Sequence, residues 1–343
     1  MSLLVVVSVA LAQVDAGVVE SADAGAFVWS PIVDVFGEFQ GRVPRDATPF
    51  TTFAVPRVQA GVEAGWNGAA GRVLLEGVYA TQGGALIGVA GDSIVIRLRE
   101  AWGGYRWKFL EAQLGLVQTL TVPEVERAFL FRELSADGLE TYRIKPPADL
   151  GATLKGHLPA GYGWVAASVT NGEGYTSREL NAGKNVEVTA AVHPVPGGAL
   201  EPLTLLGAAM IGTTGPSSTL ANRYGGGVLW AGSKLGLGAT AFTVQGWMDD
   251  GSRRALLVQG FARGELFSRL LLAARVQLFQ RDTTQDDQVL ELIGAIGIKA
   301  EPVEFFVAVH RTALSGLART ALPGVDSTDV RAVVRVRWPG LYQ

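Results

Sequence analysis

The sequence contains no cysteine. A protein without cysteine has no disulfide scaffold, no thiolate metal site, no cysteine nucleophile and no lipid-modified N-terminal cysteine. Charged residues are also scarce, because they make up 18% of the 343 residues and leave a net charge of −3. Proteins that bind nucleic acid usually carry an excess of Lys and Arg, so nucleic acid is not an expected partner.

Long hydrophobic runs are absent as well, although 48% of the residues are hydrophobic. No run approaches the roughly 18 to 20 residues that a membrane-spanning helix requires. Glycine is abundant, with 44 residues, and this abundance disfavours long helices and suits turns and closely packed strands. The apolar residues are therefore expected in many short β-strands.

Motifs of the common enzyme classes are missing from the sequence. The three histidines, His157, His193 and His310, are far apart, and there is no His-x-x-x-His pair, P-loop or Gly-x-Ser-x-Gly motif. We therefore expect no cofactor, no metal ion and no catalytic residue. A Ser–His site formed between strands is the enzymatic alternative that these observations leave open.

The first residues have the pattern of an export signal. Leu3 to Ala12 is an apolar stretch that ends in Ala10-Leu11-Ala12, a small-x-small sequence typical of a cleavage site. We predict a signal peptide at 1–12, a small, acidic periplasmic tail at 13–26 and an outer-membrane β-barrel at 27–343. The alternative for the first stretch is a buried strand, since no Lys or Arg precedes it.

The segment from Val330 to Trp338 alternates without a break between two kinds of side chain. Its valines at even positions share one face of a strand with Trp338, and its three arginines fall on the other face. A membrane barrel provides lipid outside and water inside. A shift of one residue would turn the arginines toward hydrocarbon at roughly 2 to 4 kcal/mol each, so the sequence strongly determines which face points inward.

Turn signals divide the chain from Pro31 onward into about sixteen segments of roughly ten residues, with fourteen or eighteen as alternatives. Short connections alternate with long polar ones, as in outer-membrane barrels. We predict an all-β fold, a transmembrane antiparallel β-barrel of about sixteen strands with both termini in the periplasm. A soluble β-sandwich is the alternative. The predicted short connections include Asn67 to Ala70, Gly103-Gly104, Pro159 to Gly161, Gly232 to Lys234, Arg263 to Glu265 and Ala300 to Pro302.

Two groups of side chains follow from the barrel hypothesis. Tryptophans near short turns are typical of an aromatic girdle at a membrane interface, and charged residues at inward-facing positions line the lumen, where some pair across strands. We also expect arginines of the last strand to pair with Asp34, Glu38 or Gln40 of the first. The predicted girdle is Trp66, Trp102, Trp107, Trp164, Trp230 and Trp338. The predicted pore-lining residues are Arg57, Arg97, Arg99, Arg269, Arg275, Arg331, Arg335, Arg337, Glu38 and Glu63.

The third long loop, residues 118–147, has a structural pattern of its own. Thr121 and Glu124 form a Thr-x-x-Glu capping box, and an apolar helical stripe follows it. Because an apolar stripe needs a surface to bury against, we predict that this loop folds into the barrel or caps its mouth. The alternative is an external loop that covers a neighbouring subunit. The predicted constriction residues are Glu124, Glu126, Arg127, Arg132, Arg143 and Lys145.

Leu98 to Ala101, Asp149 to Gly151, Val169 to Tyr175 and Asn181 to Lys184 form a set of motifs in the middle of the chain. This set resembles the phosphate-selective porin O/P family of outer-membrane porins. The resemblance implies a sixteen-stranded outer-membrane channel, often trimeric, with the third long loop folded into the pore. It also implies a lysine-rich constriction, whereas this third long loop carries a single lysine, Lys145, so phosphate selectivity is not carried over.

These patterns together predict an outer-membrane porin of a Gram-negative bacterium. Such a porin is an aqueous channel for passive diffusion of ions and small hydrophilic solutes, with selectivity set by lumen charges and an inward-folded loop. The expected partners are membrane lipid, lipopolysaccharide, small hydrophilic solutes and further copies of the chain in a homotrimer. The alternative is a non-conducting or plugged barrel that acts as a scaffold or as a component of a secretion or surface complex.

Overall fold

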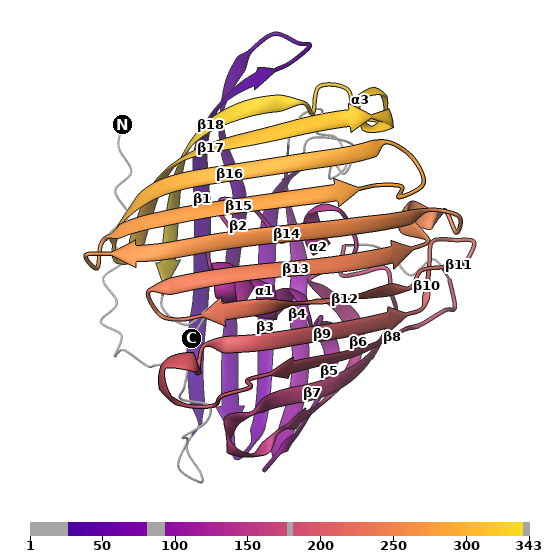
Figure 1. Cartoon of the computed structure of the whole chain (residues 1–343). Helices are drawn as coiled ribbons and strands as arrows, with labels where there is room; N and C mark the ends of the chain where they lie inside the picture. The colour runs from indigo at the N-terminus through magenta and orange to yellow at the C-terminus, as the bar shows by residue number, and fades with distance from the viewer. Residues whose placement is uncertain (1–26, 81–92, 177–180, 339–343) are drawn as a thin grey trace.

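The chain forms a closed antiparallel β-barrel of sixteen strands, shown in Figure 1. The computed structural model describes residues 27–80, 93–176 and 181–338. Each barrel strand pairs with the barrel strand that follows it in the chain, and β1 pairs with β18 to close the barrel. The predicted barrel and its even number of strands are confirmed. The predicted signal peptide and N-terminal tail lie outside the described residues.

The strands on the two sides of the barrel differ in length. The first four and the last six are long, whereas β5 to β9 and β12 have eight to ten residues each. A separate two-stranded hairpin, β10 with β11, lies between β9 and β12. The strands are β1 (Val28–Pro44), β2 (Phe50–Trp66), β3 (Ala69–Ala80), β4 (Ser93–Trp107), β5 (Leu110–Gln118), β6 (Ala148–His157), β7 (Gly163–Thr170), β8 (Asn185–Val192), β9 (Leu203–Ile211), β10 (Thr213–Thr214), β11 (Thr219–Leu220), β12 (Arg223–Ala231), β13 (Leu235–Gln245), β14 (Arg254–Leu266), β15 (Leu270–Gln280), β16 (Asp287–Ala300), β17 (Val303–Gly316) and β18 (Ser327–Trp338).

The connections alternate between short and long, as predicted, but two short turns lie elsewhere than expected. Gly103 and Gly104 are in the middle of β4, which continues to Trp107. A Cβ on Gly104 would lie 2.5 Å from the carbonyl oxygen of Ala112 on β5, so this glycine permits close strand packing and does not mark a turn. Strand β14 likewise continues through Arg263 to Leu266 before it turns.

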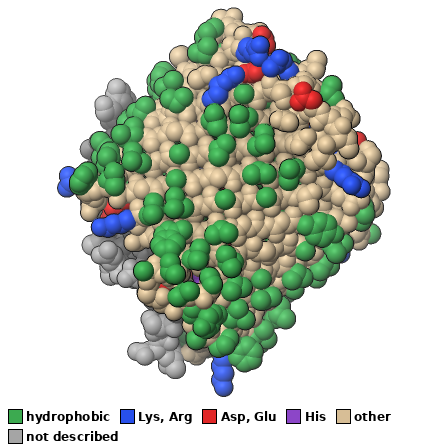
Figure 2. All heavy atoms as spheres, viewed as in Figure 1, with side chains coloured by type: hydrophobic (Ala, Val, Ile, Leu, Met, Phe, Trp, Pro, Cys, Tyr) green, Lys and Arg blue, Asp and Glu red, His purple; other side chains and the backbone are tan. Residues whose placement is uncertain are grey.

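The two faces of the strands carry different side chains. On β18, Val330 and Val334 are 52% and 38% exposed on the outer face, whereas Val333 and Arg335 are 0% exposed on the inner face. The predicted division of this strand into an outward apolar face and an inward face that carries the arginines is therefore confirmed for these residues. Figure 2 shows hydrophobic side chains spread over the outer wall, with charged side chains mainly near its margins.

The helices are short and lie in connections between strands. They are α1 (Val122–Phe129), α2 (Gly138–Thr141) and α3 (Leu317–Ala321). Within the described part of the chain, no helix is long and apolar enough to cross a membrane. Helix α1 begins where the sequence predicted, but the predicted capping box does not form. The Thr121 side chain makes no capping bond, and its hydroxyl donates to the Glu187 carboxylate at 2.7 Å.

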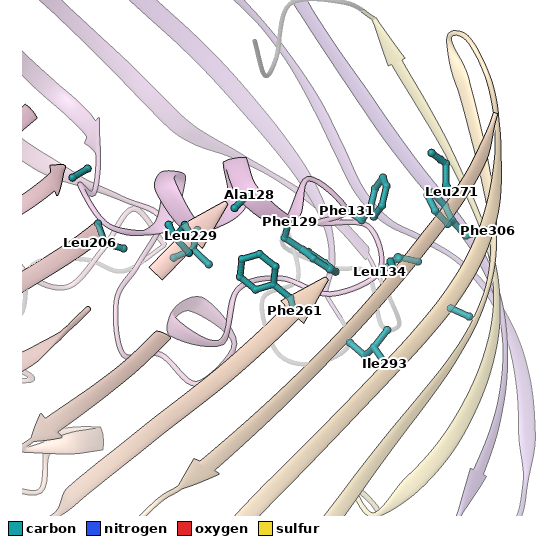
Figure 3. Close-up of a cluster of buried hydrophobic side chains, with 14 of the residues drawn as sticks. Ala128, Phe129, Phe131, Leu134, Leu206, Leu229, Phe261, Leu271, Ile293 and Phe306 are labelled. Atoms are coloured by element: carbon teal, nitrogen blue, oxygen red, sulfur yellow. The ribbon is translucent and has the colours of Figure 1, made fainter. Parts of the chain in front are cut away.

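The hydrophobic core lies inside the barrel, between its wall and residues 119–147, which connect β5 to β6. We call these residues the inner segment. Phe129 and Phe131 of the inner segment pack edge-to-face on Phe261 of β14 and Phe306 of β17, with ring centroids 5.4 and 5.0 Å apart. Figure 3 shows this cluster. The apolar stripe predicted on this loop is therefore buried against the inner faces of long strands.

Candidate functional site

The inner face of β2 to β4 carries a network of charges centred on Glu76. This carboxylate is fully buried on β3 and lies 3.2 Å from the Arg57 guanidinium and 2.7 Å from that of Arg99. It also accepts hydrogen bonds from Gln59 at 2.9 Å and from the hydroxyl of Tyr175 at 2.5 Å. Tyr175 belongs to the connection between β7 and β8, so one connection and three strands meet at this carboxylate.

A β-bulge places Arg99 and Glu100 on the same face of β4. Residue Leu74 of β3 is opposite Glu100, but Leu75 is opposite Leu98, so Arg99 is the extra residue. Because a bulge interrupts the alternation of side chains, both charged residues point inward and both are buried. Glu100 pairs with Arg72 at 3.1 Å. Simple alternation along the sequence would have turned one of these charges outward.

The inner segment reaches this charged wall through Glu140 of α2. The Glu140 carboxylate lies 3.4 Å from an Arg57 nitrogen and also pairs with Arg132, which in turn pairs with Glu126. Burial raises the pKa of Glu140, but the guanidinium groups of Arg132, Arg57 and Arg99 outweigh it and lower the pKa to about 2. Glu140 is therefore ionised at neutral pH and links Arg132 of the inner segment to Arg57 of the wall.

On the opposite side, arginines of the wall hold the backbone of the inner segment. Arg275 of β15 donates to the carbonyl oxygens of Ser135 and Ala136 at 3.0 and 2.7 Å, and its guanidinium lies 3.9 Å from the Phe129 ring centroid. Arg263 of β14 donates to the Ala128 carbonyl at 2.9 Å. Arg263 is not among the residues predicted from the sequence to line the pore, because the glycine after it suggested a turn. Its two-residue spacing from Phe261 would have identified it as inward-facing.

At the barrel seam, Arg335 of β18 contacts both the first strand and the inner segment. It donates to the two Asp34 oxygens at 2.9 and 2.7 Å and to Glu133 at 2.8 Å. The predicted pairing between the last and first strands is confirmed for Arg335. The other two arginines of β18 find partners elsewhere, since Arg331 contacts His310 and Asp329, and Arg337 lies 3.4 Å from Glu304.

Lys145, the single lysine of the inner segment, is buried and serves as an anchor. Its ammonium donates to the Glu187 carboxylate of β8 at 2.6 Å and to the Thr121 hydroxyl at 2.8 Å. Burial lowers the pKa of Lys145, although the carboxylate of Glu187 opposes this shift. Lys145 is 1% exposed, so it does not present a cation to the lumen as the constriction prediction requires.

A cavity of about 850 Å³ lies at the end of the barrel that carries the short turns. We call it the vestibule. Turn residues such as Gly68, Lys108 and Gly161 border it, and Arg127 of α1 reaches it from the inner segment. Within it, Glu111 pairs with Arg106 at 2.8 Å and lies 3.3 Å from His157. Its charged lining comprises Arg106, Lys108, Arg127 and Lys155 against Glu63 and Glu111.

Four further charged residues that were predicted to line the pore or the constriction differ from one another in where they lie. Arg269 lies in the exposed turn after β14 and does not face the lumen. Arg97 is opposite the inward-facing Glu76, and Glu38 is opposite the inward-facing Val333, so both are on the inner face. Arg143 is exposed on the inner segment. Whether the inward-facing residues line an open pore stays a prediction.

The predicted tryptophans divide between the two faces of the wall. Trp66 and Trp107 are 54% and 51% exposed on the outer face, and Trp230 lies opposite the exposed Leu237. Trp164 instead points inward, is 7% exposed, and lies 4.8 Å from the Lys155 ammonium. Trp102 is also inward, because it is opposite Arg72, which pairs with Glu100. The side chain of Trp338 is not among those described. A position near a strand end does not specify the face, which is why Trp102 and Trp164 differ from the prediction.

A metal centre has no candidate ligands in residues 27–80, 93–176 and 181–338, where no group of three or more His, Asp and Glu side chains could hold an ion. The arrangement instead defines a wall of charged side chains around a space that the inner segment partly fills. Such a wall can interact with ions and polar solutes through its charges alone, without covalent chemistry.

The architecture is that of the outer-membrane porins, and solved structures of such proteins share the fold. An anion-selective porin from Comamonas acidovorans superimposes with a TM-score of 0.67 and 10% identity over 91% of this chain and 100% of that chain. The outer membrane channel DcaP of Acinetobacter baumannii gives 0.64 and 10% identity over 92% and 99%. The Salmonella typhi OmpF complex with daunomycin gives 0.64 and 10% over 90% and 97%. No protein-family model and no curated protein sequence matches the chain.

Proposed function

We propose that this protein is an outer-membrane porin, a channel for passive diffusion of ions and small hydrophilic solutes. The observation that carries the proposal is the uneven packing of the inner segment inside a sixteen-stranded barrel. Its apolar side chains form buried clusters with residues of β7 to β9 and of β12 to β18, whereas charged side chains face it from β2 to β4. A barrel of about sixteen strands is wide enough for an aqueous lumen. A loop that leaves the charged face of β2 to β4 uncovered by apolar side chains narrows the lumen without removing its polar wall.

Selectivity in this proposal comes from the charges that face the lumen. Four cations and two carboxylates line the vestibule, so its local potential favours anions. Most charges deeper inside are paired, as Glu76 is with Arg57 and Arg99, and paired charges exert weak fields on passing ions. We therefore expect a weak anion preference. Phosphate selectivity is not part of the proposal, because the lysine of the inner segment, Lys145, is buried against Glu187.

The outer wall supports a location in the outer membrane, reached through an N-terminal signal peptide. Large apolar side chains such as Ile96 and Leu114 are 72% and 70% exposed on this wall, and contact with the hydrocarbon of a bilayer would cover them. Lipid and lipopolysaccharide are accordingly the proposed surroundings. A homotrimer remains part of the proposal, and one of the similar structures, OmpT of Vibrio cholerae, is described in a trimer form.

Single-channel recording in planar lipid bilayers tests the proposal. Protein refolded in detergent, and shown to be folded by its heat-modifiable migration on gels, is added at low concentration to one chamber. Steady, ion-permeable steps of uniform size are expected, with a reversal potential in a salt gradient that shows a weak preference for anions. A folded barrel that inserts but remains silent would overturn the porin proposal and support a scaffold or plugged barrel instead.

A further inference from the structure

Residues 130–134 of the inner segment dock on the wall through a largely buried charge cluster. At its centre, Arg335 of β18 donates to Asp34 of β1, to Glu133 at 2.8 Å and to the Leu130 carbonyl at 3.1 Å. Glu304 of β17 lies 3.8 Å from the same guanidinium. Docking of this stretch therefore combines the packing of Phe131 on Phe306 with one arginine that three carboxylates share.

The cluster contains more negative than positive charge when every group is ionised. Asp34, Glu133 and Glu304 contribute three negative charges, and Arg335 and Arg337 contribute two positive charges, since Arg337 lies 3.4 Å from Glu304. One negative charge is left without a counterion. Burying an unbalanced charge is costly, so a proton on one carboxylate would complete the balance.

Glu133 is the carboxylate best placed to take this proton. Its Oε2 accepts the hydrogen bond from Arg335, but its Oε1 is buried and has no hydrogen-bond partner within the described structure. Burial raises the pKa of Glu133 to about 7, since the opposing effect of Arg335 is offset by the nearby charges of Glu304 and Asp34. A hydrated glutamate has a pKa of 4.5, so the docked stretch binds the proton more tightly than the undocked one.

We propose that protonation of Glu133 locks residues 130–134 onto the barrel wall, which makes the inner segment a gate that responds to pH near neutrality. A group with a raised pKa in the docked state stabilises docking fully below its hydrated pKa, and this stabilisation is lost as the pH rises through the docked pKa. Between pH 5 and pH 8 the equilibrium constant for docking should decrease on the order of 100-fold. Arg275 and Arg263 hold the flanking residues at every pH, because arginine stays charged. The change is therefore confined to residues 130–134.

A nitroxide on the Leu130→Cys variant reports docking directly, because the chain has no cysteine of its own. Leu130 lies in the docked stretch and is partly exposed. In the folded protein in detergent, the mobile fraction of the spectrum should increase as the pH is raised from 5 to 8. With Glu133→Gln in the same background, the label should stay immobilised at both pH values. The matched control Glu124→Gln, on the same segment, should retain the transition.

Two results would overturn the proposal: a pH-independent spectrum in the parent, or a transition that survives Glu133→Gln. If Glu133→Gln fails to fold, Glu304→Gln provides a second test. Loss of a nearby negative charge lowers the pKa of Glu133, so the transition should move to lower pH, and an unchanged midpoint contradicts the proposal. A further expectation rests on the proposed porin function. If residues 130–134 undock as the pH rises, fluctuations in the single-channel current should increase with pH. A folded barrel that carries no current but gives a pH-dependent nitroxide spectrum would overturn the porin function and leave the pH-dependent docking of residues 130–134 intact.

Discussion

Arg335 and Asp34 form a two-point salt bridge across the barrel seam, with hydrogen bonds of 2.9 and 2.7 Å between residues 301 positions apart in the sequence. Both side chains are buried, at 0% and 1% exposure. The pair connects the last strand to the first, so it stabilises the closed form of the barrel. The same guanidinium also binds the inner segment through Glu133, which couples closure of the barrel to docking of that segment.

Removing the acid at this seam should weaken the fold. Asp34→Ala deletes two charge-assisted hydrogen bonds while Arg335 keeps Glu133 as a partner, so the free energy of unfolding should fall by about 2 kcal/mol. Urea unfolding in detergent micelles measures the change. The control is Glu38→Ala on the inner face of the same strand, which should change the free energy by less than about 0.5 kcal/mol. Equal losses in the two variants would contradict a specific role for the seam pair.

Lys145 should matter for stability and not for ion selectivity. Lys145→Ala leaves Glu187 buried without its counterion, which should cost about 3 to 5 kcal/mol in the free energy of unfolding. The reversal potential of those channels that fold should stay unchanged, because the ammonium does not face the lumen. Lys108→Ala at the exposed vestibule turn is the matched control, with little effect on stability and a lower anion preference. A lower anion preference in Lys145→Ala would instead place this lysine in the constriction.

Glu140 and Arg57 should shift ion selectivity in opposite directions. Glu140→Gln removes one negative charge beside Arg57, which keeps Glu76 as a partner, so the channel should become more selective for anions. Arg57→Gln leaves Glu140 in excess and should favour cations. One unit charge at about 4 Å is worth on the order of 1 kcal/mol in water-like surroundings, so the permeability ratio should change a few-fold. Reversal potentials in a salt gradient measure it, and two shifts of the same sign would contradict the opposing roles.

Titration of Glu140 gives the expected pH range of this effect. Its pKa is lowered to about 2 from 4.5, so the stabilisation from its ion pairs is present above pH 4.5 and is lost as the pH falls through about 2. The selectivity shift of Glu140→Gln should therefore be constant between pH 5 and pH 8. A shift that varies across this range would show that Glu140 titrates there.

Adjacent residues of β5 test which face of the wall contacts lipid. Leu114 is 70% exposed on the outer face, whereas Gln113 lines the vestibule. Leu114→Arg should lower the free energy of unfolding in a lipid bilayer by about 2 to 4 kcal/mol if it lies near the midplane. Gln113→Arg faces water and Glu111 and should cost less than about 1 kcal/mol. Similar costs for the two variants, or recovery of the protein from the aqueous fraction without detergent, would contradict a membrane location.

Much of the barrel could be predicted from the sequence because its signals are local. Alternation along each strand and the rhythm of turns act over a few residues, and they predicted the strand number and the facing of Arg335. The errors arose where one local signal has two meanings. Glycine suits both turns and close strand packing, so Gly104 was misplaced. A tryptophan near a strand end can face either way, as Trp164 does.

The partners of the buried charges could not be predicted, since they depend on three-dimensional proximity between distant segments. Lys145 and Glu187 lie 42 positions apart and meet only when the inner segment enters the barrel. The bulge at Arg99 likewise depends on the register between two strands. Composition and spacing identify which residues are charged. They do not identify which charges neutralise one another, and this decides how the lumen acts on ions.

Single-channel current through the folded protein in a planar bilayer tests the central claim most directly. The polar inner wall, and the charged face of β2 to β4 that the apolar clusters of the inner segment leave uncovered, predict steady conductance steps with a weak anion preference. Folded protein that inserts into the bilayer and carries no current would contradict the account.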